Sequence, residues 1–64
     1  MKPKIGDIII IGEDGFAIRG NILDIFLVIN IGNQLYLEDE TKYTIYIQNV
    51  HPRLRKKFIK IGEL

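Results

Sequence analysis

The sequence contains no cysteine, no serine and no tryptophan, and its single histidine is His51. The absence of cysteine excludes disulfides and thiolate metal sites. Without a serine or cysteine nucleophile, the familiar catalytic triads cannot be assembled either. A histidine before a proline turn is typical of a surface residue, and the alternatives for His51 are a lone metal ligand or a proton switch. We therefore expect a protein that is not an enzyme and that uses no cofactor and no metal ion.

Long apolar runs and leader-like features are also missing. The apolar runs, such as "IIII" at residues 8–11, are far shorter than the ~20 residues that cross a bilayer as a helix. The opening "MKPKIGD" is charged and lacks the apolar segment and the small-residue cleavage site of a secretory signal. We expect a cytoplasmic protein with no membrane partner.

The chain is short and apolar. Its 64 residues form one domain, residues 1–64, close to the lower size at which a single core is sufficient. Hydrophobic residues make up 47% of the chain, and Ile is far more frequent than Leu or Val. β-Branched side chains favour strands, because they keep their preferred rotamers on a pleated surface. The remaining support for a chain of this size is a dense apolar core or oligomerisation.

Strand-like runs alternate with short stretches that contain Gly, Asn, Asp or Pro, which is the pattern of strands and turns. The runs are "DIIII", "FAIRGNILDIF", "FLVIN", "QLYLED", "YTIYIQ" and "FIKIG". Apolar and polar residues alternate at 34–38 and 43–48, as in half-buried antiparallel strands. Pro52 suits the first position of a single tight turn before the last run, which we expect to be a 3₁₀ turn.

The order of these features resembles the SH3-like small β-barrels, a superfold that includes KOW, Tudor and Sm-type modules. The matching stretches are "GDIIII" (6–11), "IRGNILDI" (18–25), the hairpin "NIGN" (30–33) and the turn "HPRLRKK" (51–57) before "FIKIG" (58–62). Arg19–Gly20, with Ile22 two residues on, resembles the KOW-like element of a second strand. No Tudor-type aromatic cage or Sm-type paired motif can be assigned. The resemblance implies an all-β fold, a closed barrel of five or six short antiparallel strands, rather than a particular function.

Charge is distributed unevenly. Residues 1–50 carry four basic and seven acidic side chains, a net charge of −3, whereas residues 51–64 carry five basic and one acidic, a net charge of +4. Such a split indicates a two-signed surface whose basic end is available to an anionic partner. We call these five residues the basic strip: Arg53, Arg55, Lys56, Lys57 and Lys60. Phe58, which lies among them, is a further candidate binding residue. Since Lys and Arg make most phosphate contacts, we expect this strip to bind nucleic acid or another anionic ligand.

The alternation in "FIKI" predicts that Phe58 and Lys60 point outward while Ile59 and Ile61 enter the core. An exposed Phe58 beside lysines would stack on a base, and Tyr36 and Tyr46, on the polar faces of their strands, would add a secondary binding surface. The alternative is that the charges only keep the sheet edge from pairing and that Phe58 closes one end of the barrel.

A rival hypothesis starts from the apolar surplus. The run at 8–11 does not alternate, so both faces of that strand are apolar and one of them is free to meet a partner. We therefore also expect a homo-oligomeric protein–protein interaction module, with Ile9 or Ile11 at the contact. A small rigid protein of this kind would also suit a virus- or mobile-element-encoded inhibitor of a host protein.

Carboxylates cluster at residues 13–14 and 38–40, both in predicted turns. Oxygen ligands of this type are those that a divalent cation prefers. Polar side chains are equally common at solvated hairpin tips, because they bond to the turn backbone. We expect hairpin tips and no metal site.

Overall fold

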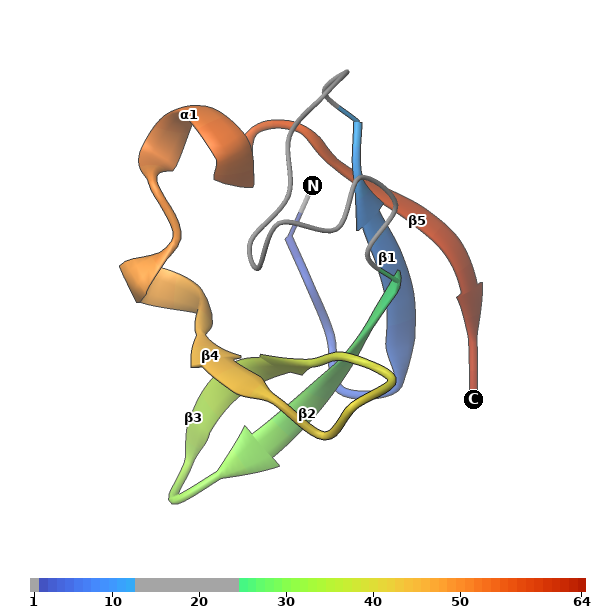
Figure 1. Ribbon diagram of the computed structural model, residues 1–64, viewed down its shortest axis with the longest axis vertical. Helices are drawn as coiled ribbons and strands as arrows, with labels where there is room; N and C mark the ends of the chain where they lie inside the picture. Colours follow the sequence, from blue (N-terminus) through green and yellow to red (C-terminus); the bar gives the residue numbers. More distant parts are fainter. Residues whose placement is uncertain (1, 13–24) are drawn as a thin grey trace.

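The computed structural model describes residues 2–12 and 25–64, and these residues form a single antiparallel sheet with very little helix (Figure 1). The elements are β1 (Asp7–Ile11), β2 (Ile25–Ile31), β3 (Gln34–Glu38), β4 (Thr44–Tyr46), η1 (Ile47–Asn49), α1 (Pro52–Arg55) and β5 (Phe58–Glu63). The order of strands across the sheet is β4-β3-β2-β1-β5. The predicted all-β fold with five antiparallel strands is confirmed. The KOW-like stretch at Arg19–Gly20 and Ile22, and the acidic pair at 13–14, lie outside the described residues.

The predicted hairpin at 30–33 joins β2 to β3 through a two-residue turn. Ile31 pairs with Gln34, and the two residues between them, Gly32 and Asn33, have φ angles of 57° and 67°. A two-residue hairpin of this kind needs positive φ at both positions, which Gly and Asn adopt at little cost. The side chain of Asn30 adds a bond, because its Oδ1 accepts from the backbone N–H of Asn33 at 3.0 Å.

Two helical turns separate β4 from β5. A 3₁₀ turn precedes the last strand, as expected, but it is η1 at Ile47–Asn49, directly after the three residues of β4. The turn at Pro52, which we expected to be the 3₁₀ turn, is instead the short α-helix α1. Pro52 then occupies the first turn of α1, where its missing N–H is not needed. The imidazole of His51 caps this turn, since its Nδ1 accepts from the backbone N–H of Arg53 at 3.0 Å. His51 therefore has a structural role at the start of α1.

The predicted closure into a barrel is wrong for the described part of the chain, because β4 and β5 are the two edges of an open sheet. Within the described residues, β4 pairs with β3 and β5 pairs with β1, and neither edge strand pairs with the other. The chain leaves the sheet at Ile47 and crosses to β5 through η1 and α1, as Figure 1 shows. In a closed barrel, pairing between the two edge strands would cover the inner face of the sheet. Here side chains of the η1–α1 connection cover it instead.

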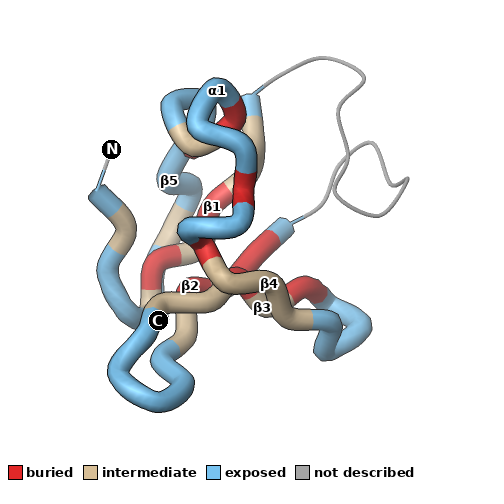
Figure 2. The backbone as a smooth tube through the Cα atoms, turned by 90° about the vertical axis from the view of Figure 1, so that its left-hand side faces the viewer, coloured by how far each residue is buried: buried red, intermediate tan, exposed pale blue. Residues whose placement is uncertain are grey.

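The core lies between the inner face of the sheet and the η1–α1 connection. Its most deeply buried members come from the three central strands: Ile9, Phe26, Val28 and Leu37. The connection and the start of β5 supply the rest: Ile47, Val50, Leu54 and Phe58. In Figure 2 these buried positions recur as short segments along several elements, while most of α1 is exposed. Side chains of the η1–α1 connection thus complete a core that the sheet alone would leave open.

The predicted orientation of β5 is wrong. Phe58 is only 6% exposed and belongs to the core, whereas Ile59 and Ile61 are 49% and 52% exposed. Phe58 pairs with Ile11, and directly paired residues of antiparallel strands share a face. The register shifts between Ile8, which pairs with Gly62, and Ile9, which pairs with Lys60, so Ile61 is the extra residue of a β-bulge.

The expected oligomer contact at Ile9 is wrong as well, because Ile9 is 0% exposed and Ile11 packs against the core. Alternation along β1 places Ile8 and Ile10 on the outer face instead.

Within the residues described, no helix is long and apolar enough to cross a membrane.

The burial of Phe58 leads to a stability prediction. Replacing Phe58 by Ala leaves a cavity in the core and should lower the free energy of unfolding by ~3–5 kcal/mol. The matched change Lys57→Ala, at the exposed neighbouring position, should alter it by less than about 0.5 kcal/mol. Urea denaturation followed by far-UV circular dichroism measures both. If Ile59→Ala lowered the free energy of unfolding more than Phe58→Ala does, the face of β5 that carries Ile59, and not the face that carries Phe58, would be the one packed in the core.

Candidate nucleic-acid interface

The structure divides the residues of the basic strip among different environments. Arg53, Lys56 and Lys57 are exposed on or beside α1, whereas Arg55 is half-buried. Phe58 lies in the core, so it has no exposed face on which a base could stack. The basic strip is therefore not one continuous surface.

Lys60 is engaged by carboxylates. Its Nζ lies 3.2 Å from Oδ1 of Asp7 and 3.3 Å from Oε2 of Glu63. Asp7 is almost fully buried, and its second oxygen, Oδ2, accepts from the backbone N–H of Lys4 at 3.0 Å. A buried carboxylate needs such partners, because an unpaired charge in the interior is costly. Lys60 thus neutralises Asp7 at the N-terminal turn, and its charge is not available to hold a separate anion.

These contacts shift both titrations. The backbone N–H of Lys4 is the largest cause that lowers the pKa of Asp7, and the Lys60 ammonium lowers it further, against the opposing effect of burial. The hydrogen bond to Asp7, followed by that to Glu63, raises the pKa of Lys60. Each group is therefore stabilised in its charged form.

The two tyrosines of the predicted secondary surface do lie together. The rings of Tyr36 and Tyr46, on paired positions of β3 and β4, have centroids 5.4 Å apart and planes inclined by 40°. The hydroxyl of Tyr46 donates to Oε1 of Gln34 at 3.0 Å. Both rings are half-buried, so each keeps some exposed aromatic surface.

A groove that the sequence pattern does not indicate connects Tyr46 with α1. It consists of two cavities of about 370 and 290 Å³ that have the same N-terminal wall, Lys2 and Pro3, and the same floor, Ile47 and Gln48. The larger cavity is bounded on its other side by Pro52, Arg55, Lys56 and Phe58. The smaller is bounded by Asn33, Gln34, Leu35 and Tyr46. We call the two together the cationic groove.

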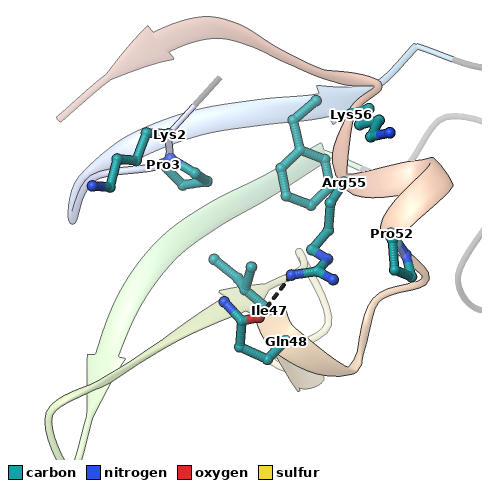
Figure 3. A pocket seen from close by; sticks show the side chains of 8 residues that line it. Lys2, Pro3, Ile47, Gln48, Pro52, Arg55 and Lys56 are labelled. Atoms are coloured by element: carbon teal, nitrogen blue, oxygen red, sulfur yellow. Dashed lines mark hydrogen bonds between the residues drawn. The ribbon is translucent and has the colours of Figure 1, made fainter.

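Figure 3 shows how the side chains of the larger cavity are placed. Lys2 and Pro3 come from the N-terminal segment on one side, and Pro52 and Arg55 of α1 come from the other, together with Lys56, which directly follows α1. Three basic residues therefore line the groove, although the ammonium ends of Lys2 and Lys56 point away from the space between its walls (Figure 3), and the described residues around it include no Asp or Glu. This is a marked segregation in a chain with eight acidic residues. A concave site with cations on two walls attracts anions.

The polar groups of the groove are mainly donors. One amine of Arg55, Nη1, donates to Oε1 of Gln48 at 2.6 Å, and Nε of Arg55 is buried and has no acceptor in the described structure. Because Gln34 and Gln48 use their oxygens to accept from Tyr46 and Arg55, their amide NH₂ groups are oriented as donors. A ligand rich in acceptor oxygens matches this set.

Only part of this site follows from the sequence. Arg55, Lys56 and Tyr46 were among the expected binding residues, and Phe58 reaches the groove as an apolar wall. Lys2 was missed, because it is separated from α1 by most of the chain and only the folded sheet brings it near. The charge split along the sequence gave no signal for it, since Lys2 lies in the acidic part.

The acidic run at 38–40 forms a hairpin tip. Oδ1 of Asp39 accepts from the backbone N–H and the hydroxyl of Thr41, at 2.8 and 2.7 Å, and from the backbone N–H of Tyr43 at 3.0 Å. This carboxylate organises the turn that reverses the chain between β3 and β4, as Asp side chains commonly do.

Comparison with known proteins gives no match to the chain among family models, curated proteins or solved structures.

The Asp7–Lys60 pair leads to a pH prediction. The lowered pKa of Asp7 means that its contribution to stability is full above the ordinary aspartate pKa of about 3.9 and is lost as the pH falls through the lowered value. The variant Asp7→Asn should be less stable than the wild type at pH 7, and this difference should shrink steadily below about pH 4. Thermal melts at a series of pH values measure it. A difference that does not change between pH 7 and pH 2 would exclude an ionised, paired Asp7.

Proposed function

We propose that this chain is a non-catalytic binding module, of the SH3-like kind that its strand pattern resembles, and that it binds single-stranded nucleic acid in the cationic groove. The observation that carries the proposal is the clustering of Lys2, Arg55 and Lys56 around a groove whose described lining contains no carboxylate. The larger cavity alone, at about 370 Å³, is already of a size that suits a nucleotide better than a single ion, since ligand pockets commonly measure about 300–1,000 Å³.

Nucleic acid fits the remaining chemistry of the groove. Its phosphates supply acceptor oxygens for the cations and for the two glutamine amides. Its bases have flat aromatic faces, and the groove offers them the half-buried ring of Tyr46 and the apolar walls of Pro3 and Pro52. Positively charged grooves with aromatic side chains are the usual design of single-strand binding sites. An acidic peptide would satisfy the cations but would leave the aromatic and apolar walls without a partner.

A single strand fits better than a duplex for a geometric reason. The phosphates of a duplex lie on a convex cylinder, whereas the cations here lie on two walls of a concave groove. A single strand can turn its phosphates toward Lys56 and its bases toward Tyr46. We therefore expect stronger binding to single-stranded than to double-stranded oligonucleotides of equal length.

The salt dependence of binding tests this proposal. If three cations contact phosphates, the slope of log K against log salt concentration should be about −2 on a single strand. Replacing Lys56 by Gln should make this slope shallower by about 0.7. Fluorescence anisotropy with a labelled ten-nucleotide strand, between 20 and 200 mM salt, measures the slope.

Lys57 provides the matched control, because it is the exposed neighbour of Lys56 and does not line the groove. Lys57→Gln should leave the slope closer to that of the wild type than Lys56→Gln does. Absence of binding at 20 mM salt, or equal effects of the two changes, would contradict the proposal. Equally tight, equally salt-dependent binding of a poly-glutamate peptide would show that the groove recognises negative charge alone.

A further inference from the structure

The outer face of the sheet is apolar over its three adjacent strands β2, β1 and β5. Ile8 pairs with Leu27, and Ile10 lies between Ile25 and Ile59 in the two neighbouring ladders. Paired residues share a face, so these five side chains form one surface on the side opposite the core. Ile25 and Ile59 are each at least 40% exposed. An apolar surface of this kind is typical of an interface.

This face has a hollow with an acidic border. A shallow cavity of about 230 Å³ is lined by Ile8, Ile25, Leu27 and Leu64 and is bordered by the acidic run at 38–40. Of these acids, Glu40 is exposed, Glu38 is 4.0 Å from the ammonium of Lys42, and Asp39 is committed to its turn. Glu40 is thus the acid of the border most open to a partner's cation.

The same face also has a projection with a basic neighbour. Ile59 projects from the edge strand β5 and is half exposed. Lys57 is exposed and lies two residues earlier, just before β5, where its carbonyl accepts from the backbone N–H of Gly12 at 2.7 Å. This bond extends the pairing of β1 with β5 by one residue beyond Ile11 and Phe58, so alternation places Lys57 on the same side as Ile59. An exposed lysine, Lys57, therefore lies next to the projecting Ile59, whereas an exposed glutamate, Glu40, lies next to the hollow.

We propose that the outer face binds a second copy of this chain, with Ile59 of each copy seated in the hollow of the other and Lys57 of each paired with Glu40 of the other. One chain carries both surfaces that the contact needs: an apolar projection next to a lysine, and an apolar hollow next to a glutamate. In an isologous dimer, a two-fold axis places the projection of each copy in the hollow of the other, so the same contact is made twice. The pairing of opposite charges at the border favours this partner over an arbitrary apolar surface.

The size of the chain supports the same conclusion. A domain of 64 residues buries only about 60% of the surface that its unfolded chain exposes, and oligomerisation is a common supplement. The dimer uses none of the residues that bound the larger cavity of the cationic groove, so it is compatible with ligand binding there.

Light scattering coupled to size-exclusion chromatography tests the dimer. The wild type at 100 µM should have about twice the mass of one chain, and Ile59→Asp should have the mass of one chain. Circular dichroism should show that Ile59→Asp is still folded, since Ile59 is outside the core. If Ile59→Asp does not fold, Ile59→Thr is the substitute, and it should shift the dimer dissociation midpoint to higher protein concentration. A monomeric wild type at 100 µM would overturn the proposal, and so would dimers of unchanged affinity in the Ile59 variants.

A charge exchange tests the orientation of the two copies. Lys57→Glu and Glu40→Lys should each raise the dissociation constant about tenfold or less, because border charge pairs are partly solvated. The double variant, which restores opposite charges across the contact, should return close to the wild-type value. A double variant as weak as the sum of its single changes would overturn the Lys57–Glu40 pairing. Oligonucleotide binding by the monomeric Ile59→Asp variant reports on the groove separately, so the two proposals fail independently.

Discussion

The pairing of Phe58 with Ile11 determines how this small sheet is completed. It turns the ring of Phe58 toward the core, where it packs with side chains of the η1–α1 connection. By alternation the same pairing turns Ile59 outward and leaves Lys57 on the outer side. One contact between two strands therefore decides which part of the basic segment stabilises the fold and which part reaches solvent.

Consecutive lysines consequently serve different surfaces. Lys56, which directly follows α1, lines the cationic groove together with Lys2. Lys57 is exposed, and its carbonyl accepts from the N–H of Gly12, which extends the pairing of β1 with β5 and directs Lys57 to the side of Ile59. Lys60 belongs to neither, because it neutralises the buried carboxylate of Asp7. A run that looks uniform in the sequence is divided by the fold into a wall of the groove, an exposed charge beside the outer face and a structural ion pair.

The strands, the hairpin at Gly32–Asn33 and the turn at Pro52 could be predicted because each depends on residues that are close together in the sequence. Alternation in β5 was visible too, but a period of two is the same for either face, and only pairing with Ile11 decides which one is buried. Barrel closure failed for a similar reason, since nothing local shows that β4 ends after three residues. Lys2 was missed because its proximity to Arg55 depends on the tertiary fold.

The wall of the groove is also part of the core, and this links binding to stability. Phe58 and Ile47 are both buried core residues and lining residues of the larger cavity. The floor of the groove therefore exists only in the folded chain, and a ligand that binds there stabilises the fold by RT ln(1 + [L]/Kd), about 2.7 kcal/mol at a hundredfold excess over Kd. For a chain whose own core is small, that is a substantial fraction of the stability expected of a single domain. Under the proposed function, the folded population of the protein would therefore rise with the concentration of a ligand of the groove, and under the proposed dimer it would rise with the concentration of the chain itself.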